Sequence, residues 1–270
     1  MNITKQVEQL LKQGDVDIFL AYRELDGHMI PHGYTLDNLE DLASLKVSQH
    51  RYSLEKVATH LTEKKPDLKI GIVARDCNQR ALNLLYTWNQ LNPENITPLM
   101  VNCCPSQTRT HSDCTYLEPK KTGTFKQEKG IDFNEDPQEF MDNNDNDQRF
   151  SRWMYEFSKC IKCYGCRNIC PVCFCPDCSL ENPDLVEPGA LPPEIPIFHL
   201  VRATHMAGRC IDCGLCEDAC PAEIPLRFLY REMNRIVSDV FDYTPGVGLE
   251  KSPFTIIGGE VTLEPRPMDA

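Results

Sequence analysis

The sequence has little of what would place a protein in a membrane or outside the cell. Residues 1–15 are polar and contain neither an apolar core segment nor a pair of arginines, so they do not resemble a secretory signal. No apolar run approaches the roughly 20 residues that a membrane-spanning helix needs. We therefore expect a cytoplasmic protein without a transmembrane segment, in which disulfide bonds are rare and cysteines bind metals.

Positive charge is also scarce. The chain has 28 lysines and arginines against 40 aspartates and glutamates, and its formal net charge is −12. A protein that binds the phosphate backbone of nucleic acids needs a basic surface, and the composition offers none. We therefore expect no nucleic acid among the partners.

Cysteine, in contrast, is abundant, with 15 residues in a chain of 270. The spacing C-x2-C-x2-C-x3-C-P starts at Cys160 and again at Cys210. This is the spacing of bacterial ferredoxins with two 4Fe–4S clusters, in which the fourth cysteine of each copy binds the cluster of the other copy. The sequence therefore predicts one cluster on Cys160, Cys163, Cys166 and Cys220, and a second on Cys210, Cys213, Cys216 and Cys170.

Two zinc sites are the alternative interpretation, because C-x2-C pairs also hold zinc. Zinc needs only two such pairs, which leaves the third cysteine and the C-P dipeptide of each copy without a purpose. The complete spacing, present twice, favours iron–sulfur clusters. Metal analysis that finds zinc without iron or sulfide would select the alternative.

The first part of the sequence alternates between apolar strands and amphipathic helices. Strands are expected at 16–22, 68–74 and 97–101, and helices at 4–13, 36–45, 54–63 and 78–90. This alternation is typical of a small parallel α/β layer, which binds ligands at the ends of its strands. The predicted fold class is α+β: a small parallel α/β domain joined to a dicluster 4Fe–4S ferredoxin-like domain.

Further cysteines are not needed by the two clusters. Three of them close expected strands of the α/β domain, and three follow the first ferredoxin motif: Cys77, Cys103, Cys104, Cys173, Cys175 and Cys178. They predict a third 4Fe–4S cluster that joins the two domains. Cys175 and Cys178 form its local pair, with Cys77 and either Cys103 or Cys104 as distant ligands. For Cys77 alone, the alternative is a small buried apolar side chain.

The rest of the chain suggests its domain organisation. We expect the α/β domain at 1–117, an acidic linker or surface excursion at 118–150, the ferredoxin-like domain at 151–242 and an extended tail at 243–270. Residues 141–147 resemble a calcium-binding loop only superficially, because its glycine and its final glutamate are absent. A helix is expected at 226–240. His199 and His205 could lie near a cluster, but the favoured interpretation is that both are structural histidines.

One-electron transfer is the chemistry that such clusters support, and the protein sets their potential through burial and hydrogen bonds to sulfur. Lys162 and Arg167 lie beside the cysteines of the first motif. Asp212, Glu217 and Asp218 lie beside those of the second motif. Because nearby positive charge favours the more negative reduced cluster, we expect the first cluster to have the higher reduction potential.

Several stretches resemble a known family. Residues 48–85 and 98–104 are similar to the beta subunits of coenzyme F-420 hydrogenases and dehydrogenases, in which strands end in cluster cysteines. The run C-P-V-C-F-C-P-D-C at 170–178 looks like the version found beside dicluster ferredoxin segments in formate dehydrogenase beta subunits. The resemblance covers roughly residues 5–110 and 155–225.

The resemblance implies partners in an anaerobic oxidoreductase complex. One is a molybdenum or tungsten formate dehydrogenase-like or hydrogenase-like catalytic subunit, and the other is a flavin-containing or heterodisulfide-reductase-like subunit. It also implies that Cys175 and Cys178 complete the third cluster. The resemblance therefore predicts a subunit that relays single electrons through three 4Fe–4S clusters and has no catalytic residues of its own.

The sequence lacks the segments with which members of this family bind deazaflavin. Neither the glycine-rich segment near the start nor the D-x-S-x-G-like segment after the cluster is present, and Arg75–Asp76 stands where a proline usually precedes Cys77. We therefore expect no flavin. The alternative is a flavin-dependent oxidoreductase that passes electrons to a deazaflavin or another soluble carrier, which release of flavin from the denatured protein would favour.

Overall fold

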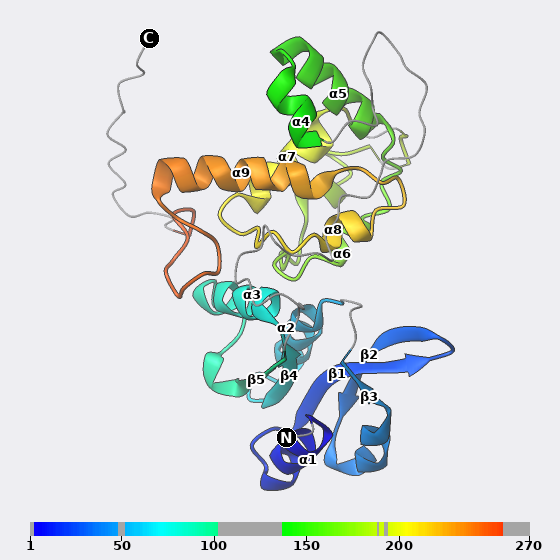
Figure 1. Ribbon diagram of the computed structural model, residues 1–270, viewed down its shortest axis with the longest axis vertical. Helices are drawn as coiled ribbons and strands as arrows, with labels where there is room; N and C mark the ends of the chain where they lie inside the picture. The colour runs from blue at the N-terminus through cyan, green and yellow to red at the C-terminus, as the bar shows by residue number, and fades with distance from the viewer. Residues whose placement is uncertain (1–2, 48–51, 102–136, 188, 192–193, 256–270) are drawn as a thin grey trace.

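The structure is a computed structural model that describes residues 3–47, 52–101, 137–187, 189–191 and 194–255. It has two parts along its long axis (Figure 1). A sheet with its helices, from residues 3–101, occupies one end, and a mostly helical, cysteine-rich region, from residues 137–255, occupies the other. The boundaries expected at 117 and 150 stay predictions.

The sheet has five strands in the order β2-β1-β4-β5, with β3 paired to β1. Its parallel core confirms the expected α/β layer, whereas β2 and β3 run antiparallel to β1. The strands are β1 (Ile18–Leu25), β2 (His28–Tyr34), β3 (Leu45–Lys46), β4 (Ile70–Ala74) and β5 (Ile96–Met100). The sheet is therefore mixed rather than purely parallel. The sequence does not indicate β2, because Pro31 and Gly33 interrupt its strand pattern.

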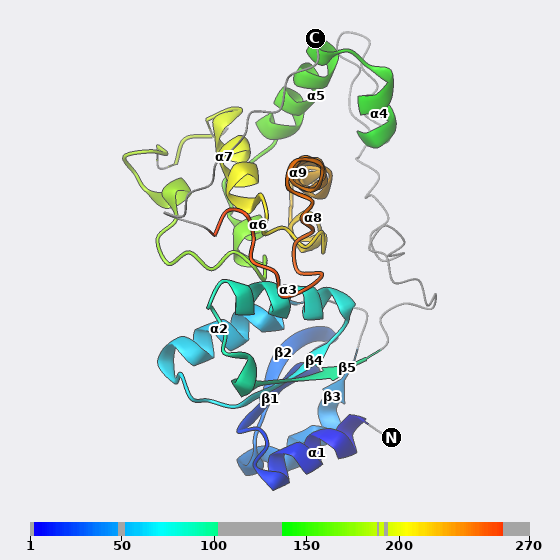
Figure 2. The same cartoon turned by 90° about the vertical axis from the view of Figure 1, so that its left-hand side faces the viewer.

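Helices cover both faces of the sheet (Figure 2). Helices α2 (Leu54–Lys64) and α3 (Asp76–Thr87) lie between the sheet and the cysteine-rich region, and α1 (Ile3–Gln13) lies on the far side. The segment expected as a helix at 36–45 is the 3-10 helix η1 (Leu36–Ser44), with a kink at Asn38. All residues of β4 are buried, as expected of a central strand covered on both faces.

Buried polar side chains meet where β4 leads into α3. Glu55 is 1% exposed and accepts a hydrogen bond from Asn78 Nδ2 at 2.6 Å. Asn78 Oδ1 in turn accepts from the backbone N–H of Arg75 at 2.9 Å. The second oxygen of Glu55, Oε2, has no hydrogen-bond partner within the described residues. Burial raises the pKa of Glu55 to about 7.

We expect Glu55→Gln to stabilise the protein more at pH 8 than at pH 5.5. In the unfolded chain a glutamate ionises near its ordinary pKa, whereas folded Glu55 ionises only near 7. The unfolded state therefore binds fewer protons between these values, and the free energy of unfolding falls as pH rises through them. Glutamine keeps the acceptor for Asn78 without a charge, so its gain above pH 7 is roughly 1 to 3 kcal/mol. Urea unfolding at both pH values measures the difference, and a gain that is independent of pH would contradict the assignment.

The cysteine-rich region is built from four longer helices and two short ones. They are α4 (Pro137–Asn143), α5 (Asn146–Ser158), α6 (Gly165–Asn168), α7 (Ile197–Met206), α8 (Leu215–Asp218) and α9 (Leu226–Phe241). The helix expected at 226–240 is thus confirmed. The acidic segment at 118–150 contains α4 and the start of α5, whose Asp145 caps the helix by accepting from the Gln148 N–H at 2.9 Å. Among the described residues, no helix has the length and apolar character needed to cross a membrane.

The two parts are joined by side chains of α2 and α3. Lys56 Nζ donates to the carbonyl oxygens of Arg167 and Cys173, both at 3.2 Å. Arg80 on α3 donates to the carbonyl oxygen of Pro245 at 2.7 Å. The backbone of Gly246 packs against Arg80 so closely that a Cβ there would collide with the arginine's carbonyl oxygen. The segment that follows α9 is therefore held against α3 by a hydrogen bond and by close backbone packing.

Candidate metal centres

Each ferredoxin motif folds as a loop that ends in one short helix. The loop residues before that helix have positive φ, namely Lys162 and Tyr164 in the first motif and Asp212 and Gly214 in the second. In both copies the backbone N–H two residues after the first cysteine donates to its sulfur at 3.4 Å. The two motifs therefore have the same local geometry, as their equal spacing predicts.

The cysteines of the first predicted set line one hollow, which we call the first hollow. It contains Cys160, Cys163, Cys166 and Cys220. Three of these cysteines come from the first motif, and the fourth comes from the end of the second motif. The remaining lining is mainly apolar and aromatic, and includes Ile161, Phe198, Ile224 and Leu226.

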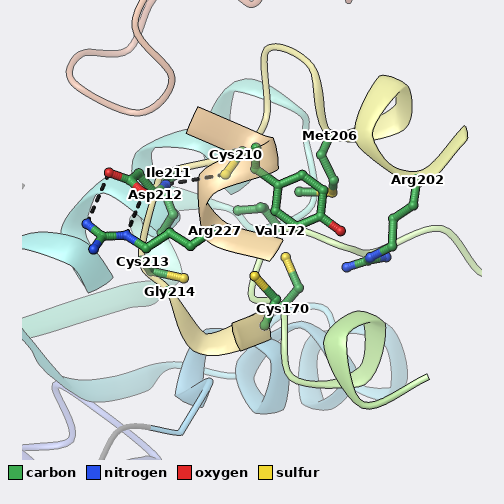
Figure 3. Close-up of a pocket in the computed structure, with 12 residues that line it drawn as sticks. Cys170, Val172, Arg202, Met206, Cys210, Ile211, Asp212, Cys213, Gly214 and Arg227 are labelled. Carbon is green, nitrogen blue, oxygen red and sulfur yellow. Dashed lines mark hydrogen bonds and ion pairs between the residues drawn. The ribbon is translucent and has the colours of Figure 1, made fainter. Parts of the chain in front are cut away.

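The other predicted set lines a second hollow, which contains Cys210, Cys213, Cys216 and Cys170. Figure 3 shows Cys170, Cys210 and Cys213 around one space, with Arg227 on one side and Arg202 on the other. Here too, three cysteines come from one motif and the fourth from the other. The structure thus brings the eight ferredoxin cysteines together in the two crossed groups of four.

These surroundings fit a 4Fe–4S cluster. Four cysteines around an apolar space are the donor set of such a cluster. Burial raises the pKa of the Cys160 thiol to about 11 and that of the Cys210 thiol to about 12. Buried thiols of this kind give up their protons when a metal binds the sulfur. Among the described residues, no three or more histidine, cysteine or acidic side chains are arranged to hold a single metal ion.

The two hollows differ in burial. All four cysteines of the second hollow are at most 9% exposed. In the first hollow Cys163 is exposed, and the neighbouring Ile161 is 53% exposed. The first hollow therefore lies nearer the surface than the second.

The charged residues beside the motifs are paired with opposite charges. Lys162 Nζ lies 3.1 Å from a carboxylate oxygen of Glu194, beside the first hollow. Beside the second hollow, Asp212 pairs with Arg227 at 2.7 Å. These pairs cancel much of the charge difference between the motifs. The higher reduction potential of the first cluster stays a prediction. The ion pairs weaken the argument for it, because they reduce the difference in charge between the two motifs.

Arg202, on α7, lies between the two groups of cysteines. Its side chain is 3% exposed and donates to the carbonyl oxygen of Cys166 at 2.7 Å and to the sulfur of Cys173 at 3.8 Å. Its guanidinium also lies 5.9 Å from the ring centre of Tyr230. Tyr230 and the cysteines Cys166, Cys170 and Cys173 lie near enough to Arg202 to interact with its charge. Because an isolated buried cation is costly, Arg202 favours negative charge in the adjoining hollows.

The cysteines predicted for a third cluster have different surroundings. Cys77, at the start of α3, belongs to an apolar cluster that includes cysteines of both hollows. Cys175 is exposed and accepts from Arg209 Nη1 at 3.6 Å, and Cys178 precedes the 3-10 helix η5 (Ser179–Glu181). Cys103 and Cys104 lie outside the described residues. The third cluster therefore stays a prediction.

Helix α7 supplies two lining residues that the sequence did not assign to the site. His199 lines the first hollow, and Arg202 lines the second. A signal was available, because positions 199, 202, 203 and 206 have the spacing of one helical face. That spacing does not reveal what the face covers.

Comparison with known proteins identifies the cysteine-rich region. Residues 203–225 match the 4Fe–4S binding domain family. Over 96 residues, the chain is 47% identical to F420-dependent formate dehydrogenase subunit beta of Methanocaldococcus jannaschii. The two are homologous. Over 101 residues it is 46% identical to F420-dependent formate dehydrogenase 1 subunit beta of Methanococcus maripaludis.

These matches cover only part of each protein. They include 36% and 37% of this chain, and 25% and 26% of the two relatives. The chain thus spans about a quarter of the length of the curated relatives that it matches. The resemblance to formate dehydrogenase beta subunits is confirmed for this segment, and with it a ferredoxin-type 4Fe–4S region.

Proposed function

We propose that this protein is an electron-relay subunit of a formate dehydrogenase-like complex. It passes single electrons between a catalytic subunit, of the formate dehydrogenase or hydrogenase type, and a flavin-containing or heterodisulfide-reductase-like subunit. The observation that carries the proposal is the pair of hollows, each lined by three cysteines of one motif and one of the other. The names of the homologous beta subunits support the type of complex.

The ligands of the first cluster are Cys160, Cys163, Cys166 and Cys220, and those of the second are Cys210, Cys213, Cys216 and Cys170. When bound, a 4Fe–4S cluster takes up and gives back one electron. The chain holds the thiolates, keeps water away with apolar side chains and places Arg202 between the two groups. Short helices α6 and α8, which contact each other, carry ligands for both hollows. This contact would place the two clusters near each other and allow an electron to pass between them inside the protein.

The first hollow is more exposed than the second, which indicates where electrons enter or leave the protein. Cys163 and Ile161 bring the first cluster near the surface, where a partner subunit exchanges electrons with it. Cys77, on α3, joins the apolar cluster that includes cysteines of both hollows. This position supports a third cluster between the two parts of the chain, with Cys77, Cys175, Cys178 and either Cys103 or Cys104 as ligands. Cys173 is a further candidate.

Anaerobic purification followed by iron and sulfide analysis tests the proposal. We expect about eight iron atoms per chain if two clusters are bound, and about twelve if the third is present. Formate and a formate dehydrogenase catalytic subunit should then reduce the clusters, as measured by electron paramagnetic resonance. Zinc in place of iron would contradict the proposal. Flavin released on denaturation would instead favour a flavin-dependent subunit.

A further inference from the structure

His199 is buried with both ring nitrogens unsatisfied. Its side chain is 2% exposed, and neither Nδ1 nor Nε2 has a hydrogen-bond partner among the described residues. An imidazole carries at least one N–H group in either protonation state. A buried donor without an acceptor costs free energy, so an unpaired ring at this position requires an explanation.

Aromatic neighbours hold the ring of His199 in place. It stacks on Phe157 with the ring centres 4.7 Å apart and the planes at 18°. The ring of Phe198 meets it edge-on, with the centres 5.2 Å apart. This packing keeps the imidazole away from bulk water and leaves it in the wall of the first hollow. An acceptor for its N–H must therefore come from inside that hollow.

The protein lining of the first hollow offers few acceptors other than sulfur. The hydroxyl of Tyr164 donates to the carbonyl oxygen of Leu180 at 2.7 Å and makes no hydrogen bond with His199. Lys162 is a donor and pairs with Glu194. The cysteine sulfurs, and the sulfides of a cluster held by them, are the acceptors that remain. Hydrogen bonds to these sulfurs raise the potential of a cluster, because the reduced state is more negative.

We propose that His199 donates a hydrogen bond from its ring N–H to a sulfur atom of the first cluster and thereby raises the reduction potential of that cluster. The inference rests on the proposed function, since it requires a cluster in the first hollow. Burial is the main reason that the pKa of His199 falls to about 4. In either protonation state the ring has at least one N–H group that can donate to such a sulfur. It also supplies a second reason for the first cluster to have the higher potential.

Redox titration of the anaerobic holoprotein, followed by electron paramagnetic resonance, tests this role. In His199→Phe, which keeps an aromatic ring but has no N–H, the midpoint potential of the first cluster should fall while that of the second stays unchanged. His199→Gln restores an N–H donor and should recover part of the shift. His205→Phe, on the exposed side of the same helix, is the matched control and should change neither potential.

A spectroscopic measurement on the wild type tests the hydrogen bond from His199 even if the variants lose the cluster. With ¹⁵N-labelled histidine, the reduced first cluster should show a weak nitrogen coupling in pulsed electron paramagnetic resonance. A normal iron content without this coupling would overturn the inference and leave the proposed function intact. A wild-type protein without iron would overturn both. An unchanged first potential in a fully loaded His199→Phe variant would also overturn the inference.

Discussion

Cys220→Ser should remove the cluster of the first hollow, even though Cys220 belongs to the second motif. The structure places this cysteine with Cys160, Cys163 and Cys166, and away from the three cysteines that precede it in its own motif. A serine hydroxyl is a poor replacement for a thiolate ligand, which iron–sulfur clusters require. We expect the iron content to fall by about four atoms per chain. Anaerobic iron analysis and electron paramagnetic resonance measure the loss.

Three matched variants make this test specific. Cys163→Ser should lose the same cluster as Cys220→Ser and leave the same residual spectrum. Cys170→Ser and Cys213→Ser should lose the cluster of the second hollow and leave the spectrum of the first cluster. If the spectrum of Cys220→Ser matched that of Cys213→Ser, each motif would bind its own cluster, and the crossed assignment would be wrong.

Arg202→Met should lower the reduction potentials of both clusters. Arg202 is buried, lines the second hollow and donates to the carbonyl oxygen of Cys166, a residue of the first hollow. Its positive charge stabilises the extra electron of each reduced cluster in surroundings where water cannot screen it. Methionine keeps the length and packing of the side chain without the charge. We expect a fall of about 60 mV or more at the second cluster, or roughly 1.4 kcal/mol for one electron, and a smaller fall at the first.

Two variants control for effects other than charge. Arg202→Lys keeps a cation and should retain most of both potentials. Arg235→Met removes an exposed arginine that pairs with Glu232 at 3.0 Å and lines neither hollow. It should leave both potentials in place. Potentials in Arg202→Met that equal those of the wild type would show that the buried charge does not act on the clusters.

The sequence predicts those parts of the fold in which a simple pattern is undisturbed. Strand β4 is apolar along its length because it is buried on both faces, and α9 has an apolar face at helical spacing. Strand β2 was not predicted, because Pro31 and Gly33 occur in a strand that pairs along one edge of the sheet. Helix α5 begins in an acidic run whose capping role becomes clear only once Asp145 is seen beside Gln148.

At the candidate site, too, some residues follow from a sequence pattern and others do not. Cysteine spacing alone predicts both groups of four, because the geometry of a short loop and helix determines where each sulfur lies. His199 and Arg202 carry no such spacing. Their roles follow from the side of α7 that faces the hollows, and this depends on how a distant segment packs. Long-range pairing is likewise what leaves the ligands of the third cluster undecided between Cys103 and Cys104.

The exchange of one cysteine between the motifs has a consequence for the history of the chain. Under the proposed assignment neither repeat could replace the other, because each would supply one cysteine to the donor set of its twin. Deleting one repeat, or shifting its reading frame, would leave both hollows with incomplete sets at once. The two repeats would therefore be kept or lost together in the descendants of this chain.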